Sequence, residues 1–263
     1  MFGKKASMVS AMFEKCCVLF NIGILQGQVA KVQNLDSDEG LKSAAKYFQG
    51  AAGTFQRLRE LVFAHLQTPP TPDMSAECTT ALQSLMLAQA QECFVLKVAR
   101  DKMKPINVAK LAMQASDLYA DAYSNMIVGS VKEMWDKSWL AIVSSKQAHL
   151  HGYAQHYMAL QCKTDKKFGS SIARMQKALE LLKEADRKGS GYFQTKTFYG
   201  QVQRELETTQ KDNNIIYNDL IPKFDTLEPI PKTTIAKPVP FQAPPPNFVD
   251  IFSSLMPLSL IHI

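Results

Sequence analysis

Residues 85–104 read LMLAQAQECFVLKVARDKMK, with apolar side chains recurring every three or four positions. This spacing predicts an α-helix, which we place at 75–103. At about 100° per residue, the helix carries two apolar stripes on different sides. The first stripe consists of Leu82, Leu85, Met86, Cys93 and Leu96, and the second of Leu87, Phe94 and Val98. Such a helix either lies between two layers or exposes one stripe to a partner, and the sequence favours the first arrangement.

The same periodicity continues in both directions from this helix and predicts an all-α chain. Prolines and glycines mark the joints between the helices, and no segment alternates at period two for long enough to indicate a sheet. Short joints between antiparallel helices suggest a helical solenoid or an elongated bundle. No strict repeat of about 34 residues supports a tetratricopeptide array by sequence. The predicted helices span 6–32, 40–66, 75–103, 106–125, 128–162, 166–187 and 191–213, within a helical core of 1–220.

The character of the sequence changes after this helical core. Eight of the thirteen prolines lie between Pro222 and Pro246, which excludes a helix there and favours extended backbone. Apolar residues lie between the prolines, whereas a free linker would be poorer in them. We therefore predict that 221–247 form an extended arm packed across the helices, followed by a short helix at 248–255. The apolar residues of the arm are Phe224, Leu227, Ile230, Ile235, Val239 and Phe241.

The composition fits a folded chain with a sizeable core. The 263 residues are 46% hydrophobic and 21% charged, with a net charge of +6. Lys and Arg are scattered among Asp and Glu, which is not the concentrated basic stripe of a nucleic-acid-binding protein. No apolar run reaches the ~18 residues of a membrane span, and no secretory signal opens the chain. Five cysteines, an odd number, indicate buried thiols in a reducing, cytoplasmic setting.

No catalytic or metal-binding motif stands out. The P-loop, the nucleophile elbow of hydrolases and the zinc-protease motif are all missing from the sequence. His149 and His156, seven residues apart, could share one helical face, and His151 points elsewhere. We interpret the histidines as structural or surface residues and Cys16-Cys17 as ordinary thiols. The sequence thus predicts no enzyme, no cofactor and no small-molecule substrate.

The predicted helix at 106–125 indicates a binding face. Its row Asn107, Leu111, Gln114 and Leu118 mixes polar and apolar residues, which suits the margin of a groove better than the centre of a core. If Phe94 and Leu111 lie side by side on adjacent helices, they would form an apolar trough. Such a trough could hold an amphipathic helix of a partner.

Several long segments resemble the Bro domain family of endosomal-sorting adaptors, and within it the Alix-like branch. The resemblance covers nearly the whole chain in the right order, so it is more specific than any single motif. The segments are EKCCVLFNIGILQGQVA at 14–30, NLDSDEGLKSAAKYFQGAAGTF at 34–55, LMLAQAQECFVLKVARDKMK at 85–104, KKFGSSIARMQKALELLKEA at 166–185, KDNNIIYND at 211–219 and IAKPVPFQAP at 235–244.

The resemblance implies a curved, boomerang-shaped all-α domain with a tetratricopeptide-like core and no enzymatic activity. It also implies a cytoplasmic adaptor that is recruited to endosomes. There the domain would bind the C-terminal amphipathic helix of an ESCRT-III subunit, the charged multivesicular body protein of type four. In the family's groove, the central aromatic matches Phe94, an aliphatic matches Leu111 and an acidic contact matches Asp38.

The chain departs from the family pattern in two respects. A groove aliphatic of the family falls on Asn107, which would remove an apolar contact of about 1–2 kcal/mol if the position is buried. The family domain also begins well before the residue that matches Met1. We therefore expect 1–263 to be a partial Bro domain.

Two alternatives stay open at this point. A curved helical domain of net positive charge could instead bind an anionic membrane surface through a basic face. Tyr217, just before the arm, is either a half-buried anchor for the arm or a regulatory, partner-binding tyrosine.

Overall fold

The described part of the chain forms seven α-helices and several short helical turns, and it contains no strand. The computed structural model describes residues 10–65, 70–193 and 195–242. The fold class is therefore all-α, as predicted. The helices are α1 (Ala11–Lys31), α2 (Asp38–His65), α3 (Ala76–Arg100), α4 (Pro105–Met126), α5 (Lys137–Thr164), α6 (Phe168–Gly189) and α7 (Lys196–Asp212).

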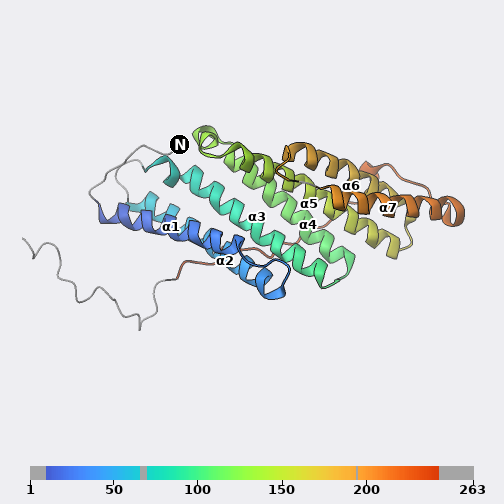
Figure 1. Ribbon diagram of the computed structural model, residues 1–263, viewed down its shortest axis with the longest axis horizontal. Helices are drawn as coiled ribbons and strands as arrows, with labels where there is room; N and C mark the ends of the chain where they lie inside the picture. The colour runs from blue at the N-terminus through green and yellow to red at the C-terminus, as the bar shows by residue number, and fades with distance from the viewer. Residues whose placement is uncertain (1–9, 66–69, 194, 243–263) are drawn as a thin grey trace, which may run out of the picture.

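Each helix packs mainly against the next one along the chain, so the molecule is elongated (Figure 1). α3 lies between α2 and α4 and has extensive contacts with both. α3 is thus sandwiched between two helices, as the sequence favoured, while Leu87, Phe94 and Val98 of its second stripe stay only partly buried. The largest hydrophobic cluster joins α3, α4 and α5 around the fully buried Tyr119 and Met126.

Two predicted helix boundaries are wrong. The predicted helix 128–162 is divided, because residues Gly129–Met134 form a 3-10 helix and α5 begins only at Lys137. The carboxylate of Asp136 caps α5 by accepting a hydrogen bond from the N–H of Ser138, 2.7 Å away. The predicted helix 191–213 starts later, at Lys196, and its end continues into a π-helical turn at Asn213–Tyr217.

The other helices begin and end within a few residues of the prediction. Two predicted features cannot be compared in full, because residues 6–9 of the first helix and the short helix at 248–255 lie outside the described residues.

Asn218 ends the π-helical turn in a left-handed backbone conformation, and the arm then runs without a regular helix from Asp219 to Gln242 except for a 3-10 turn at Phe224–Thr226. Figure 1 shows it returning along the far side of the helices toward α2. Its backbone bonds to two helices, since the N–H of Val239 donates to the carbonyl oxygen of Gln49 at 3.0 Å and that of Thr233 donates to Lys110 at 3.4 Å.

The side chains of the arm contribute less to its packing than the sequence suggested. Ile230 is buried, but Ile235, Val239 and Phe241 are 41%, 43% and 38% exposed. The small Ala236 is the buried contact instead, at 4% exposure. An extended chain points alternate side chains to opposite sides, so Ala236 faces the helices while Ile235 faces away.

Glycines on the helices allow the arm to approach closely at both of its ends. A Cβ atom on Gly53 of α2 would lie 1.7 Å from the carbonyl oxygen of Val239. A Cβ atom on Gly169 of α6 would lie 2.0 Å from that of Leu220. Both distances are far below van der Waals contact, so any other residue at these positions would displace the arm.

Candidate partner-binding face

The arm crosses the second apolar stripe of α3. Ala236 belongs to a hydrophobic cluster with Ala90 and Cys93 of α3, and Leu87 and Phe94 pack against this cluster. Phe94 is only partly buried. The arm therefore covers part of the stripe, and Phe94 keeps an exposed apolar surface next to it.

Leu111 is placed differently from Phe94. It is 4% exposed and belongs to the cluster of α3, α4 and α5. Phe94 packs instead on the cluster that α3 shares with α1, α2 and the arm. The two residues are linked through Gln91, one turn before Phe94, whose side-chain N–H donates to the carbonyl oxygen of Leu111 at 3.4 Å. Leu111 thus contributes little exposed surface of its own.

Asn107 lies in the first turn of α4 and is partly buried. Its backbone N–H donates to the carbonyl oxygen of Lys104 at 2.9 Å. The neighbouring Ile106 is also partly buried, and its N–H donates to the side-chain oxygen of Gln161 at 3.3 Å. Both positions therefore leave some side-chain surface at the start of α4.

Asp38, at the start of α2, lies in a charge-balanced cluster. Its carboxylate is 3.0 Å from Lys97 and 3.8 Å from Arg100, and Lys97 also pairs with Asp101 at 2.5 Å. The hydrogen bond from Lys97 lowers the pKa of Asp38. The sequence could not reveal this pairing, because the lysine lies 59 residues away on another helix.

A second charged group is enclosed between α3, α4 and α5. The carboxylate of Glu92 accepts hydrogen bonds from Lys146 at 2.7 Å and from the hydroxyl of Tyr119. Burial would raise the pKa of Glu92, but the charge and hydrogen bonds of Lys146 and the Tyr119 hydroxyl outweigh it, so the pKa lies below its ordinary value. This network fixes three helices together, and its groups satisfy one another rather than facing a substrate.

The histidines of α5 are structural, as predicted. His149 and His156 share one face, and both pack on the ring of Phe198, at centroid distances of 5.8 and 5.2 Å. His156 is 1% exposed, and its Nε2 lies 2.7 Å from the carboxylate of Glu205 on α7. His151 points elsewhere, toward Gln155 at 3.3 Å.

Tyr217 closes the π-helical turn at the base of the arm. Its ring stacks on Phe168 at a centroid distance of 3.6 Å and an interplanar angle of 9°, while 47% of the residue stays exposed. The carboxylate of Asp219 accepts a hydrogen bond from the N–H of Gly169 at 2.8 Å. These contacts favour an anchoring role at the start of the arm, and a regulatory role of Tyr217 stays a prediction.

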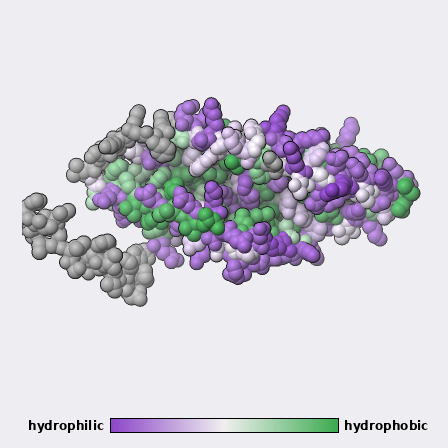
Figure 2. Space-filling model, in the orientation of Figure 1, coloured by the Kyte–Doolittle hydropathy of each residue, from purple (hydrophilic) through white to green (hydrophobic). Residues whose placement is uncertain are grey.

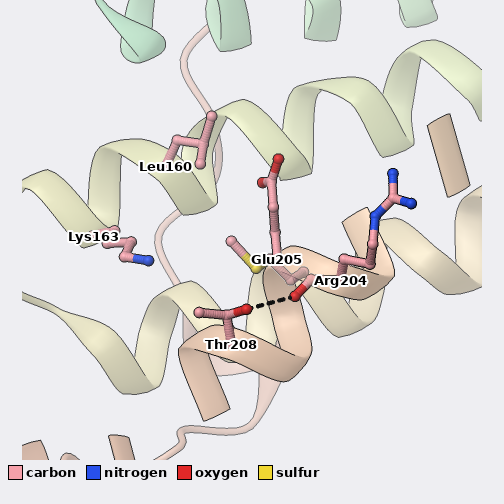
Figure 3. Close-up of a pocket in the computed structure, with 6 residues that line it drawn as sticks. Leu160, Lys163, Arg204, Glu205 and Thr208 are labelled. Carbon is pink, nitrogen blue, oxygen red and sulfur yellow. Dashed lines mark hydrogen bonds between the residues drawn. The ribbon is translucent and has the colours of Figure 1, made fainter. Parts of the chain in front are cut away.

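One open pocket lies between α5, α6 and α7 (Figure 3). The hydroxyl of Thr208 donates to the backbone carbonyl of Arg204 at 3.0 Å, the dashed line of Figure 3. Glu205 is already engaged by His156. The lining of the pocket combines apolar and oppositely charged side chains and does not resemble a catalytic constellation. The lining residues are Leu160, Lys163, Met175, Arg204, Glu205 and Thr208.

No group of three or more His, Cys, Asp and Glu side chains in the described ranges could hold a metal ion. None of the described helices is long and apolar enough to cross a membrane. The five cysteines carry free thiols, four of them buried and Cys17 partly so.

Comparison with known proteins gives a consistent family assignment. A BRO1-like domain family matches residues 1–263. Programmed cell death 6-interacting protein of Mus musculus is 40% identical over 257 residues, which are 97% of this chain and 29% of that protein. Apoptosis-linked gene 2-interacting protein X 1 of Caenorhabditis elegans is 36% identical over 267 residues, covering 99% of this chain and 30% of that protein. The chain therefore spans about three tenths of the length of these relatives.

Solved structures agree with this assignment. The ALIX BRO1 domain in complex with CHMP4C superposes with a TM-score of 0.90 and 39% identity, covering 96% of this chain and 71% of that one. A second structure, of ALIX with the SIVmac239 PYKEVTEDL late domain, gives a TM-score of 0.90 at 38% identity, covering 99% of this chain and 37% of that one. Because the family match extends over residues 1–263, the chain belongs to the family of BRO1-like domains.

Proposed function

We propose that this chain is a non-enzymatic adaptor domain that captures one amphipathic helix, the C-terminal helix of a CHMP4-type ESCRT-III subunit. Support comes from the similarity to a BRO1 domain solved with CHMP4C. As an endosomal adaptor, the domain would carry the curved, tetratricopeptide-like core expected of the family and would be recruited from the cytoplasm to endosomes by this contact.

The half-exposed stripe of α3 is the observation that carries the proposal. Phe94 presents an aromatic surface beside the arm rather than inside the core. Exposed apolar surface with a polar rim is typical of a binding site for a helix with apolar residues at i, i+3, i+4 and i+7. In this proposal Asp38, which pairs with Lys97 one turn after Phe94, would belong to the polar rim. Asn107 would contribute from the start of α4, and the buried Leu111 would support the groove from below.

Titration with a fluorescent peptide of the CHMP4 C-terminal helix tests this function. Saturable binding is expected for the 263-residue chain and a loss of about a hundredfold or more for Phe94→Asp, because the new carboxylate would be buried under the partner without compensation. Phe63→Asp is the matched control, since Phe63 lies on another helix, α2, is 94% exposed, and its replacement should leave the affinity unchanged.

Two results would contradict the proposal. Equal affinities of the wild type and a folded Phe94→Asp variant would remove the groove assignment. Absence of peptide binding, together with salt-sensitive binding to anionic vesicles that survives Phe94→Asp, would favour the membrane-surface function instead.

A further inference from the structure

A single buried amide connects the arm to the candidate groove. Gln91 is 0% exposed and lies on α3 between Leu87 and Phe94, two partly buried residues that pack on the same cluster as Ala236 of the arm. A glutamine on an apolar helix face is an unfavourable core residue unless its hydrogen bonds are satisfied. The hydrogen-bond partners of Gln91 therefore determine whether it destabilises the core or holds other segments in place.

All hydrogen-bonding groups of the Gln91 carboxamide are used, and they reach two other segments. The side-chain N–H groups donate to the carbonyl oxygens of Thr233 in the arm at 2.9 Å and of Leu111 in α4 at 3.4 Å. The side-chain oxygen accepts from the backbone N–H groups of Ile235 at 3.1 Å and Ala236 at 3.0 Å. Four hydrogen bonds thus hold the arm and α4 in one register against α3.

We infer that Gln91 is a positioning residue for partner binding: by holding the arm against α3, it keeps Phe94 in a preformed groove wall. This inference rests on the proposed function. When the arm detaches, Ala236 leaves the cluster on which Phe94 packs, and the ring loses one of its supports. A groove that must first be assembled binds its ligand more weakly than one that is preformed.

The arm has a second fixation point that does not involve Gln91, which separates the role of the arm from that of the glutamine. At Gly53 of α2, the carbonyl oxygen of Val239 occupies the space that a Cβ atom would need. Gly53→Ala should therefore displace the arm while improving the intrinsic helix propensity of α2. It provides a way to release the arm without changing Gln91 itself.

The test combines two readouts on the full chain with three variants. Gln91→Met keeps the approximate shape of the side chain and removes its hydrogen bonds, and Gly53→Ala displaces the arm sterically. Gln89→Met is the control, because it makes the same change of residue type two positions away on α3. The side-chain oxygen of Gln89 has no hydrogen-bond partner among the described residues. Circular dichroism verifies that each variant is folded.

The first readout is amide hydrogen exchange at Ile235 and Ala236, and the second is affinity for the CHMP4 helix peptide. In Gln91→Met and Gly53→Ala, we expect exchange about tenfold faster or more and peptide binding about fivefold weaker or more. Gln89→Met should change neither. If Gln91→Met proves unfolded, the Gly53→Ala variant alone decides whether the arm supports the groove.

Two outcomes would overturn the inference in distinguishable ways. Faster exchange with unchanged affinity would show that the arm does not position the groove, while the proposed function would stand. A wild type with protected arm amides but no peptide binding would remove the proposed function and the positioning role together.

Discussion

The two ends of the helical stack bury their side chains differently. Around α5, α6 and α7, aromatic rings enclose His149 and His156, and Glu205 engages the latter. Around α2, α3 and α4, the apolar stripe of α3 stays half-exposed and is held by the backbone of a distant arm. The aromatic cluster of the first region is sealed by its own side chains, although an open pocket lies beside it, whereas the second region is closed only in part.

This difference shows where the molecule can bind a partner without unfolding. A sealed aromatic cluster contributes its burial to stability, and the open pocket beside it has oppositely charged side chains in its lining rather than an apolar stripe. A stripe that is covered in part by an extended segment keeps apolar surface available and costs some stability. Figure 2 shows one face of the molecule, on which hydrophobic residues gather over the α1–α2 end amid a mostly polar surface. Each prediction below disturbs one region and should leave the other intact.

The largest expected effect lies in the sealed region and depends on pH. Burial lowers the pKa of His149 to about 4 from an ordinary 6.5, despite the nearby Glu92, while Lys146 lowers it further. The folded state therefore favours the neutral ring, and stability that is fully present above pH 6.5 is lost as the pH falls toward 4. The shift corresponds to about 3 kcal/mol of unfolding free energy.

His149→Phe should remove that part of the pH dependence. Urea unfolding at pH 7 and pH 4.5 measures it, with His65→Phe at an exposed position of α2 as the control. We expect the difference in unfolding free energy between the two pH values to shrink by about 2–3 kcal/mol in His149→Phe only. An undiminished difference would mean that the ring is not sealed as described.

A smaller effect, a gain in peptide affinity, is expected in the partly closed region around α2, α3 and α4. Asn107→Ile should tighten binding of the CHMP4 helix peptide by about 1–2 kcal/mol, because an aliphatic side chain at the start of α4 would add buried apolar surface. Asn214→Ile, at an exposed position after α7, controls for non-specific hydrophobic binding of the peptide to an added isoleucine. Weaker binding of Asn107→Ile would place this position outside the groove or assign its amide a hydrogen bond to the partner.

The smallest effect is expected at the charged rim. Asp38 is already paired with Lys97 and Arg100, so Asp38→Asn should weaken peptide binding only about threefold, with a larger change at low salt. Glu39→Gln is the matched control, since Glu39 is an exposed neighbour that pairs only with Lys42. A loss as large as that of Phe94→Asp would identify Asp38 as the main anchor instead.

Local patterns in the sequence predicted the helices well, because each pattern lies within one segment. The apolar residues on several sides of α3 agree with its position between α2 and α4. The late start of α5 also had a local signal, the capping Asp136 with Ser138, but the apolar residues before it resemble a continuing helix.

The arm shows what a sequence cannot reveal. Its proline spacing predicted extended backbone, yet the contacts that hold it include Gln91 of α3 and Gln49 and Gly53 of α2. Gln91 bonds to residues 142 to 145 positions away, so no local pattern could identify it. Likewise, the half-exposure of Phe94 and the burial of Leu111 depend on how α3, α4 and the arm meet.

A double-mutant cycle between Phe94 and the partner helix tests the central claim most directly. Phe94→Ala is combined with an alanine replacement of one apolar anchor of the CHMP4 peptide, and the four affinities are measured. Direct packing of the two side chains predicts a coupling free energy of about 0.5–3 kcal/mol for one anchor. Additive losses at every apolar anchor would contradict the claim that the partner helix is buried against Phe94.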